Sequence, residues 1–193
     1  MKLLHIYGSP RQQGNTADIS AVFCKVAERH GASVECYDLN RLSYRGCQAC
    51  FACKKSSERC VLQDDITPAL DAIQEADVIL FSSPVYYTDV TAQLKGFIDR
   101  TFSYFVPDYW KHEKKSRLRP GKQLVFLLVQ GATDEERFND IFPRYREIFS
   151  WHPFKQIHLL RATGVYRPGQ AAKRPDIMLK AEQLAERIFT RGT

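Results

Sequence analysis

The sequence lacks the segments that would place the chain in a membrane or divide it into several units. No apolar run approaches the roughly 20 residues that cross a bilayer, and no repeat or low-complexity linker interrupts the 193 residues. We also expect no signal peptide, because an apolar run that predicts a strand begins at Leu3. We therefore expect a single domain over residues 1–193 that is cytoplasmic and has no membrane partner.

Several ligand-binding motifs are missing as well. There is no G-x-x-x-x-G-K-[ST] segment and no G-x-G-x-x-G segment, which argues against a nucleoside-triphosphate loop and a dinucleotide fingerprint. The net charge of +6 is spread along the chain and favours anionic ligands in general. Its densest basic stretch, 111–119, accompanies no nucleic-acid motif, so we expect a solvated loop there and no nucleic-acid partner.

A polar loop, Gly8 to Thr16, stands between a predicted strand (3–7) and a predicted helix (16–30). Unpaired N–H groups at a helix N-terminus, together with hydroxyls and an arginine, can bind a phosphate monoester. The simpler alternative is an ordinary connecting loop with Asn15 or Thr16 as helix cap. The candidate phosphate-binding residues are Ser9, Arg11, Gln13, Gly14, Asn15 and Thr16.

The rest of the chain alternates apolar strands with amphipathic helices, which predicts an α/β fold with a doubly wound, five-stranded parallel sheet. The further strands are expected at 33–38, 78–81, 124–129 and 157–160, and the further helices at 67–76, 91–102, 134–151 and 175–191. The order 2-1-3-4-5, with 33–38 near an edge, is one of two common solutions. It places ligands where strands one and three end, and so brings loop 8–16 beside the loop after Phe81.

That second loop is rich in aromatic and small polar residues. Pro84 stiffens it, and the adjacent tyrosines offer flat faces that could contact a planar ring system. A tyrosine pair packed on a helix is the alternative. The candidate ring-binding residues are Ser83, Pro84, Val85, Tyr86, Tyr87 and Thr88.

The two loops resemble signatures of the flavodoxin-like NADPH-dependent FMN reductase family. The resemblance lies in Gly-Ser-Pro-Arg at 8–11, Gly-Asn-Thr at 14–16, Ser-Pro-Val-Tyr-Tyr at 83–87, and the helix at 92–100. It implies a flavodoxin-like fold, FMN with its phosphate on the first loop and its isoalloxazine on 84–87, and NAD(P)H as electron donor. It also implies a homodimer or homotetramer, and flavin contacts from Gln130 and Gly131 in the loop after strand four.

A cysteine cluster is the other conspicuous feature. Cys47, Cys50, Cys53 and Cys60 have a spacing of C-x2-C-x2-C-x6-C, and four thiolates can bind a [4Fe–4S] cluster. A four-cysteine zinc site and free or redox-active thiols are the alternatives. The spacing resembles the compact motif of the iron-sulfur flavoprotein family, a branch of the same group. Cys24 and Cys36 lie outside the cluster and are expected to be packed.

These features lead to two main functional hypotheses. The first is an FMN-dependent oxidoreductase that passes electrons from NAD(P)H or a reduced carrier, through FMN, to a small-molecule or protein acceptor. The alternative is an iron-sulfur flavoprotein that carries electrons between ferredoxin-like partners through a [4Fe–4S] cluster and FMN. We predict no catalytic side chain, because the flavin supplies the chemistry. A non-catalytic sensing domain would leave the two matched loops unexplained.

Overall fold

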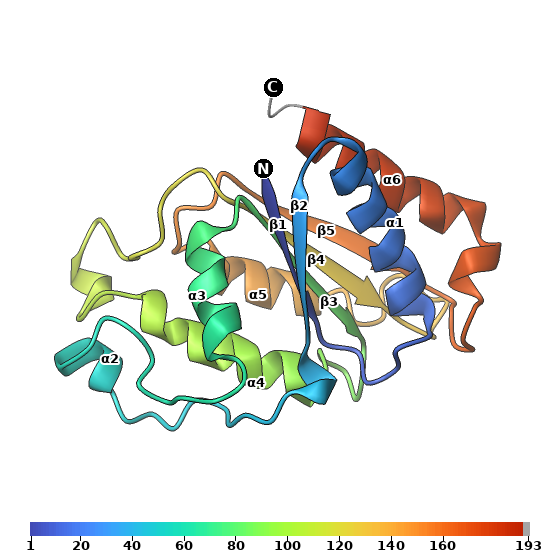
Figure 1. The fold of residues 1–193 in the computed structure, drawn as a ribbon. Helices are drawn as coiled ribbons and strands as arrows, with labels where there is room; N and C mark the ends of the chain where they lie inside the picture. Colours follow the sequence, from blue (N-terminus) through green and yellow to red (C-terminus); the bar gives the residue numbers. More distant parts are fainter. Residues whose placement is uncertain (191–193) are drawn as a thin grey trace.

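The five strands form one parallel sheet in the order β2-β1-β3-β4-β5 (Figure 1). The structure is a computed structural model and describes residues 1–190. The strands are β1 Lys2–Tyr7, β2 Ser33–Asp38, β3 Val78–Pro84, β4 Gln123–Val129 and β5 Gln156–Ala162. The predicted sheet order and the edge position of the second strand are confirmed.

Helices cover both faces of the sheet, as predicted. In Figure 1 the first and last helices lie together on one face, and the third, fourth and fifth lie on the other. The helices are α1 Asn15–Arg29, α2 Ala52–Lys55, α3 Thr67–Glu75, α4 Ala92–Arg100, α5 Ile141–Phe149 and α6 Pro175–Thr190. Short 3-10 turns are η1 Leu39–Arg41, η2 Thr101–Tyr104, η3 Tyr109–Lys111 and η4 Ala171–Lys173.

The central strands are buried on both faces, which explains why their sequences are continuous apolar runs. Successive side chains of β3 and β4 point alternately into two cores. One core lies under α1 and α6 and includes Leu80 and Val125. The other lies under α3, α4 and α5 and includes Phe81 and Phe126, whose rings meet edge to face at a centroid distance of 5.4 Å.

Several predicted boundaries differ from the structure. The helix expected over 134–151 begins only at Ile141, because residues 134–140 form a loop on which the Arg161 guanidinium binds carbonyl oxygens. Helix α3 begins at Thr67, as expected, and ends at Glu75, one residue earlier than expected. Cys24 is half-buried and Cys36 is exposed on β2, so the expectation that both are packed is wrong for Cys36. The expected last helical residue, at position 191, lies outside the described residues.

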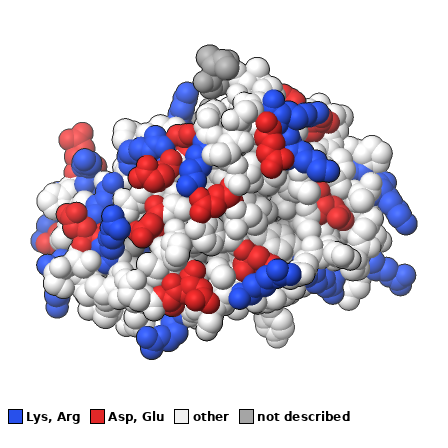
Figure 2. All heavy atoms as spheres, viewed as in Figure 1, with Lys and Arg blue, Asp and Glu red and all other residues white. Residues whose placement is uncertain are grey.

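The surface carries its charge in mixed form. On the face drawn in Figure 2, basic and acidic side chains are interspersed. The basic stretch 111–119 is only partly a solvated loop, since Ser116 and Leu118 are buried and the Arg117 guanidinium donates to the carbonyls of Ser103 and Phe105. Within residues 1–190, none of the helices combines the length and the apolar character needed to cross a bilayer.

Candidate functional site

The ends of β1 and β3 are joined by short hydrogen bonds that fix the two predicted loops side by side. The Gly8 N–H donates to the Ser82 carbonyl at 2.8 Å, and the Thr91 hydroxyl donates to the Gly8 carbonyl at 2.6 Å. A Cβ at position 8 would lie 2.7 Å from the Leu94 Cβ. Glycine is therefore required at position 8 by the close approach of β1 to α4.

A groove with a volume of about 730 Å³ opens where these loops meet. Its size lies in the range of small-molecule and cofactor sites. It has a polar end at the start of α1 and an apolar, aromatic side after β3. The lining residues are Ser9, Arg11, Gly14, Asn15, Thr16, Pro84, Val85, Tyr86, Tyr87, Val129, Gly131, Ala132, Arg137, Phe138, Val165 and Tyr166.

The polar end is built from backbone donors at the start of α1. The first intrahelical bond runs from Asp18 N to Gly14 O, so the N–H groups of residues 15–17 have no partner within the helix. The Ser9 hydroxyl accepts from the Arg11 N–H at 3.2 Å and shapes the turn. The Arg11 side chain is exposed at the groove. This arrangement suits an anionic group, because the helix dipole and a guanidinium both favour negative charge there.

The aromatic side is a tight turn after β3. Tyr86 and Asp89 exchange backbone hydrogen bonds at 2.8 and 3.1 Å, and Tyr87 and Thr88 between them have φ of 49° and 73°. Such left-handed conformations are uncommon for residues other than glycine and cluster at ligand sites. The turn leaves the Tyr87 ring fully exposed at the groove.

Four of the sequence-predicted residues do not line the groove: Gln13, Ser83, Thr88 and Gln130. The buried Ser83 hydroxyl donates to the Pro84 carbonyl and accepts from the Thr91 N–H. The Gln130 amide donates to the Ala132 and Asp134 carbonyls and accepts from Arg161. Ser83 and Gln130 therefore hold the loops in place from behind the groove.

The structure also adds residues that the sequence did not indicate: Arg137, Phe138, Val165 and Tyr166, with Val129 and Ala132. The Asn15 amide donates to the carbonyls of Val165 and Arg167, and its oxygen accepts from the Ala171 N–H. Tyr166 packs on Gly131, where a Cβ would lie 2.9 Å from the ring. Segment 164–173 has no periodicity that would have revealed this role.

His5 lies on β1, and its ring reaches the neighbouring strand β3. Its Nε2 is 2.7 Å from the Ser82 hydroxyl, and the ring is buried. Burial lowers the pKa of His5 to about 4, because an imidazolium would lose its hydration there. His5 is therefore neutral at pH 7 and supports the sheet as an uncharged hydrogen-bonding group.

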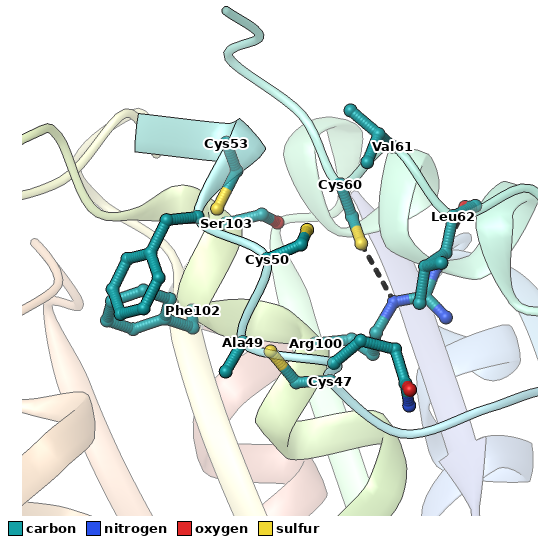
Figure 3. A pocket seen from close by; sticks show the side chains of 12 residues that line it. Cys47, Ala49, Cys50, Cys53, Cys60, Val61, Leu62, Arg100, Phe102 and Ser103 are labelled. Carbon is teal, nitrogen blue, oxygen red and sulfur yellow. Dashed lines mark hydrogen bonds between the residues drawn. The ribbon is translucent and has the colours of Figure 1, made fainter. Parts of the chain in front are cut away.

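The cysteine cluster forms a second pocket, on the opposite side of the molecule from α1 and α6 (Figure 1). Cys47, Cys50, Cys53 and Cys60 all line this pocket, whose volume is about 30 Å³. Figure 3 shows their side chains arranged around it, with Phe102 at one side and Arg100 at the other. Cys47 and Cys50 are exposed, and the other two are half-buried.

The sulfurs do not converge on one point. Within residues 1–190, no three His, Cys, Asp or Glu side chains could hold a metal ion as placed. Ala49 and Phe51 of this loop have φ of 49° and 56°, which again marks a strained segment. The Arg100 Nε donates to the Cys60 sulfur at 2.9 Å, a contact that no local sequence pattern indicates.

Lys54 fastens the same loop to the body of the protein. Its ammonium donates to the Phe102 and Phe105 carbonyls at 2.6 Å and lies 4.2 Å from the centroid of the Phe102 ring. Burial lowers the pKa of Lys54, because the ammonium loses water as it packs against the Phe102 ring.

Curated relatives resemble this chain over part of its length. An iron-sulfur flavoprotein of Archaeoglobus fulgidus is 38% identical over 104 residues, which is 54% of this chain and 47% of that protein. An iron-sulfur flavoprotein of Methanosarcina thermophila is 33% identical over 101 residues, 52% of each chain. The matched part thus spans about half the length of these relatives.

Solved structures resemble the whole fold. An NAD(P)H:quinone oxidoreductase from Methanothermobacter marburgensis superposes with a TM-score of 0.74 at 19% identity over 97% of this chain and 96% of that one. An FMN-dependent NADH-azoreductase from Bacillus anthracis, solved with FMN, gives 0.69 at 13% identity over 98% of both chains. At these identities the likeness concerns the fold.

A family model covers nearly the whole chain. The model described as flavodoxin-like fold matches residues 1–188. The resemblance drawn from the two loops is thereby confirmed, together with the sheet order that it implies. The chain belongs to the family of proteins with the flavodoxin-like fold.

Proposed function

We propose that this protein is an FMN-dependent oxidoreductase that binds its flavin in the groove at the ends of β1 and β3. The observation that carries the proposal is the pairing of an anion-binding helix start with an exposed aromatic turn in one groove of about 730 Å³. FMN has a phosphate at one end and a planar ring system at the other. The two ends of the groove therefore match the two ends of this cofactor.

The phosphate would bind where α1 begins. The N–H groups of residues 15–17 supply donors, and Arg11 supplies the cation. The Asn15 side chain is occupied with the 165–171 segment, so its part is to position that segment. The Thr16 side chain, at the same end of the groove, is buried.

The ring system would lie against residues 84–87, with Tyr166 and Phe138 across the groove. FMN, when bound, accepts and returns electrons as hydride or singly. The chain's own task is to hold the ring between apolar surfaces, exclude water and present backbone donors to its edge. Among residues 1–190, the only acidic or basic side chains that line the groove are those of Arg11, Arg137 and the tyrosines. The groove residues that we identify would therefore bind and orient the flavin.

We further propose NAD(P)H or a reduced protein carrier as electron donor. Two neighbours are named for NAD(P)H and NADH chemistry, and a relative from Pongo abelii is named as a ribosyldihydronicotinamide dehydrogenase that uses quinone. The exposure of Tyr87 at the groove fits a homodimer or homotetramer in which a second subunit covers the flavin. The acceptor would be a small molecule or a protein.

The sharpest test compares FMN with riboflavin, which lacks the phosphate. In Arg11→Gln we expect FMN affinity to fall about 10- to 100-fold, since a hydrogen bond to a charged group contributes about 1.5–3 kcal/mol. Riboflavin affinity should hardly change. Flavin fluorescence titration measures both.

The matched control is Arg59→Gln, which removes the same charge from a surface pair with Asp71 outside the groove. It should bind both flavins as the unmodified protein does. Wild-type protein that gains no flavin absorption on addition of FMN would refute the proposal. If Arg11→Gln lowered the affinity for FMN and for riboflavin equally, Arg11 would not be the residue that binds the phosphate.

A second function is favoured by the cysteine pocket: the protein would also carry a [4Fe–4S] cluster as an electron store beside FMN. Four thiols line one pocket, thiolates are the ligands of such clusters, and the relatives that match half the chain are named iron-sulfur flavoproteins.

The residues present fit this group by donor type and number. A four-iron cluster takes one thiolate on each iron, so its ligands are spread around it and need not converge on one point. The pocket as it stands has room for little more than water, so the strained loop at 47–51 would have to widen. Iron and sulfide analysis of anaerobically purified protein tests the proposal, and absence of both would refute it.

A further inference from the structure

We propose that Arg100 is a positioning residue for the redox group of the cysteine pocket, and that its hydrogen bond to the Cys60 sulfur raises the reduction potential of that group. The inference rests on the iron–sulfur part of the proposed function. It concerns a residue outside the four-cysteine motif, contributed by the last position of α4.

The geometry of the guanidinium carries the argument. Arg100 Nε lies 2.9 Å from the Cys60 Sγ, and only one N–H can point from that atom. The other nitrogens bind the Arg45 and Leu62 carbonyls at 2.9 Å and the Asp64 carboxylate at 2.8 Å. The planar fork thus joins residue 45 to the 62–64 segment and directs its single Nε–H to sulfur.

Charge balance supports the same assignment. The Arg100 side chain is completely buried, and guanidinium stays charged in proteins. Asp64 is its ion-pair partner, yet Asp64 Oδ1 is buried and has no hydrogen-bond partner within residues 1–190. A Cys60 thiolate on a bound cluster would add a second negative charge beside the guanidinium.

Hydrogen bonds and positive charge at ligand sulfurs are established means of setting a cluster's potential. Reduction adds an electron to the cluster and makes it more negative. A buried cation with its N–H on a ligand sulfur stabilises that reduced form more than the oxidised one, because Coulomb interactions are strong away from water. Arg100 should therefore raise the potential.

Helix α4 also links this residue to the flavin groove. Its N-cap, Thr91, donates to the Gly8 carbonyl at the base of the groove, and its last residue, Arg100, donates to Cys60. Nine helical residues span about 13 Å. One rigid element thus sets the position of both sites relative to each other.

Arg117 provides a matched control. It too is an arginine next to the cysteine loop, but it reaches the loop through the Cys53 carbonyl at 3.3 Å and otherwise binds the Ser103 and Phe105 carbonyls. Arg117→Gln removes the same charge near the pocket without touching a sulfur.

The experiment is a redox titration of anaerobically purified protein, with the cluster followed by electron paramagnetic resonance and FMN by visible absorption. For Arg100→Gln we expect at least a tenfold fall in the equilibrium constant for one-electron reduction of the cluster, which is a lowering of 59 mV. The FMN potential should stay the same, and Arg117→Gln should shift the cluster by much less.

Arg100→Lys covers the case in which Arg100→Gln does not fold, because the ammonium keeps the charge opposite Asp64 but lacks the planar fork. It should retain FMN and show a lowered cluster potential. An unchanged potential in a folded, iron-loaded Arg100 variant would overturn the proposal. So would an equal shift in Arg117→Gln.

The outcomes separate this inference from the flavin assignment. Wild-type protein that binds FMN but takes up no iron would overturn the role of Arg100 and leave the flavin proposal standing. Protein that takes up iron but binds no FMN would overturn the flavin proposal and leave the role of Arg100 standing. Circular dichroism and iron content of each variant distinguish a shift in potential from loss of the fold.

Discussion

The groove that we propose for the flavin and the cysteine pocket are built in opposite ways. The groove is made of residues from four distant parts of the chain, around 9–16, 84–87, 129–138 and 165–166, brought together by parallel strands and their buried hydrogen bonds. The cysteine pocket takes its four thiols from 14 consecutive positions, Cys47 to Cys60, in a segment with one short helix.

The difference concerns what makes each site rigid. The groove has a volume of about 730 Å³ before any ligand is considered, because the sheet holds its walls apart. The pocket has about 30 Å³. Its loop is held by Arg100 and Arg117, which reach into it from the rest of the protein, and by Lys54, which reaches out of it to the Phe102 carbonyl. The groove is open without a ligand because the sheet topology places its walls. The pocket lies in a loop, so its shape depends on contacts between that loop and the rest of the protein.

Removing one thiol of the pocket should have the largest effect, because it should abolish iron binding at one site and leave FMN binding at the other unchanged. In Cys50→Ser we expect loss of bound iron, because a hydroxyl is a poor ligand for an iron–sulfur cluster, while FMN affinity remains as in the unmodified protein. Iron analysis and flavin titration measure the two sites on the same sample. The control is Cys36→Ser, at an exposed thiol on β2 outside the pocket. Retention of full iron by Cys50→Ser would count against the cluster.

Acid should destabilise the protein through two buried histidines, His5 on β1 and His152, which stacks on Phe105. Burial lowers the pKa of both to about 4. In the unfolded state these histidines take up protons below about pH 6.5, whereas in the folded state they stay neutral down to about pH 4. Protons therefore bind the unfolded state preferentially, and stability is lost as the pH falls from about 6.5 to 4.

The expected loss is about 3 kcal/mol for each histidine over that interval, from about 1.36 kcal/mol per unit of pKa shift. Urea unfolding at several pH values measures it. His5→Phe and His152→Phe should each flatten the pH dependence by about half. If the groove and the cysteine pocket unfold independently, flavin and near-ultraviolet signals will show separate midpoints. An unaltered slope in both variants would contradict the assignment.

The smallest effect is expected at Asn15, which ties the groove's first loop to the segment at 165–171. Asn15→Ala removes three hydrogen bonds to Val165, Arg167 and Ala171, and we expect a loss of about 2 kcal/mol in the free energy of unfolding. FMN affinity should also fall, because Tyr166 would no longer be held over Gly131. Chemical denaturation and flavin titration check both.

Gln13→Ala is the control for that change, since Gln13 is exposed and does not line the groove. It should leave stability and FMN affinity unaltered. If Asn15→Ala binds FMN normally, the 165–171 segment does not form a wall of the flavin site.

Much of the fold was predictable from local patterns. The apolar runs at 78–81 and 124–129 indicate strands buried on both faces, and their alternation with amphipathic helices predicts a parallel sheet. The observed order 2-1-3-4-5 is one of two common solutions for such a sheet, and the family resemblance favours it. The helix predicted over 134–151 was wrong at its start, because Arg161 from β5 binds the carbonyls of the preceding loop. No local signal reports such a partner.

The sequence by itself determined the strand and helix alternation, the loop that opens α1, and the cysteine spacing, because each depends on neighbours a few residues apart. Only the tertiary structure decided that Ser83 and Gln130 stand behind the groove, that Tyr166 forms part of its wall, and that Arg100 donates to Cys60. Those contacts join residues distant in the chain, and they form only once the packing of sheet and helices has fixed where each side chain can reach.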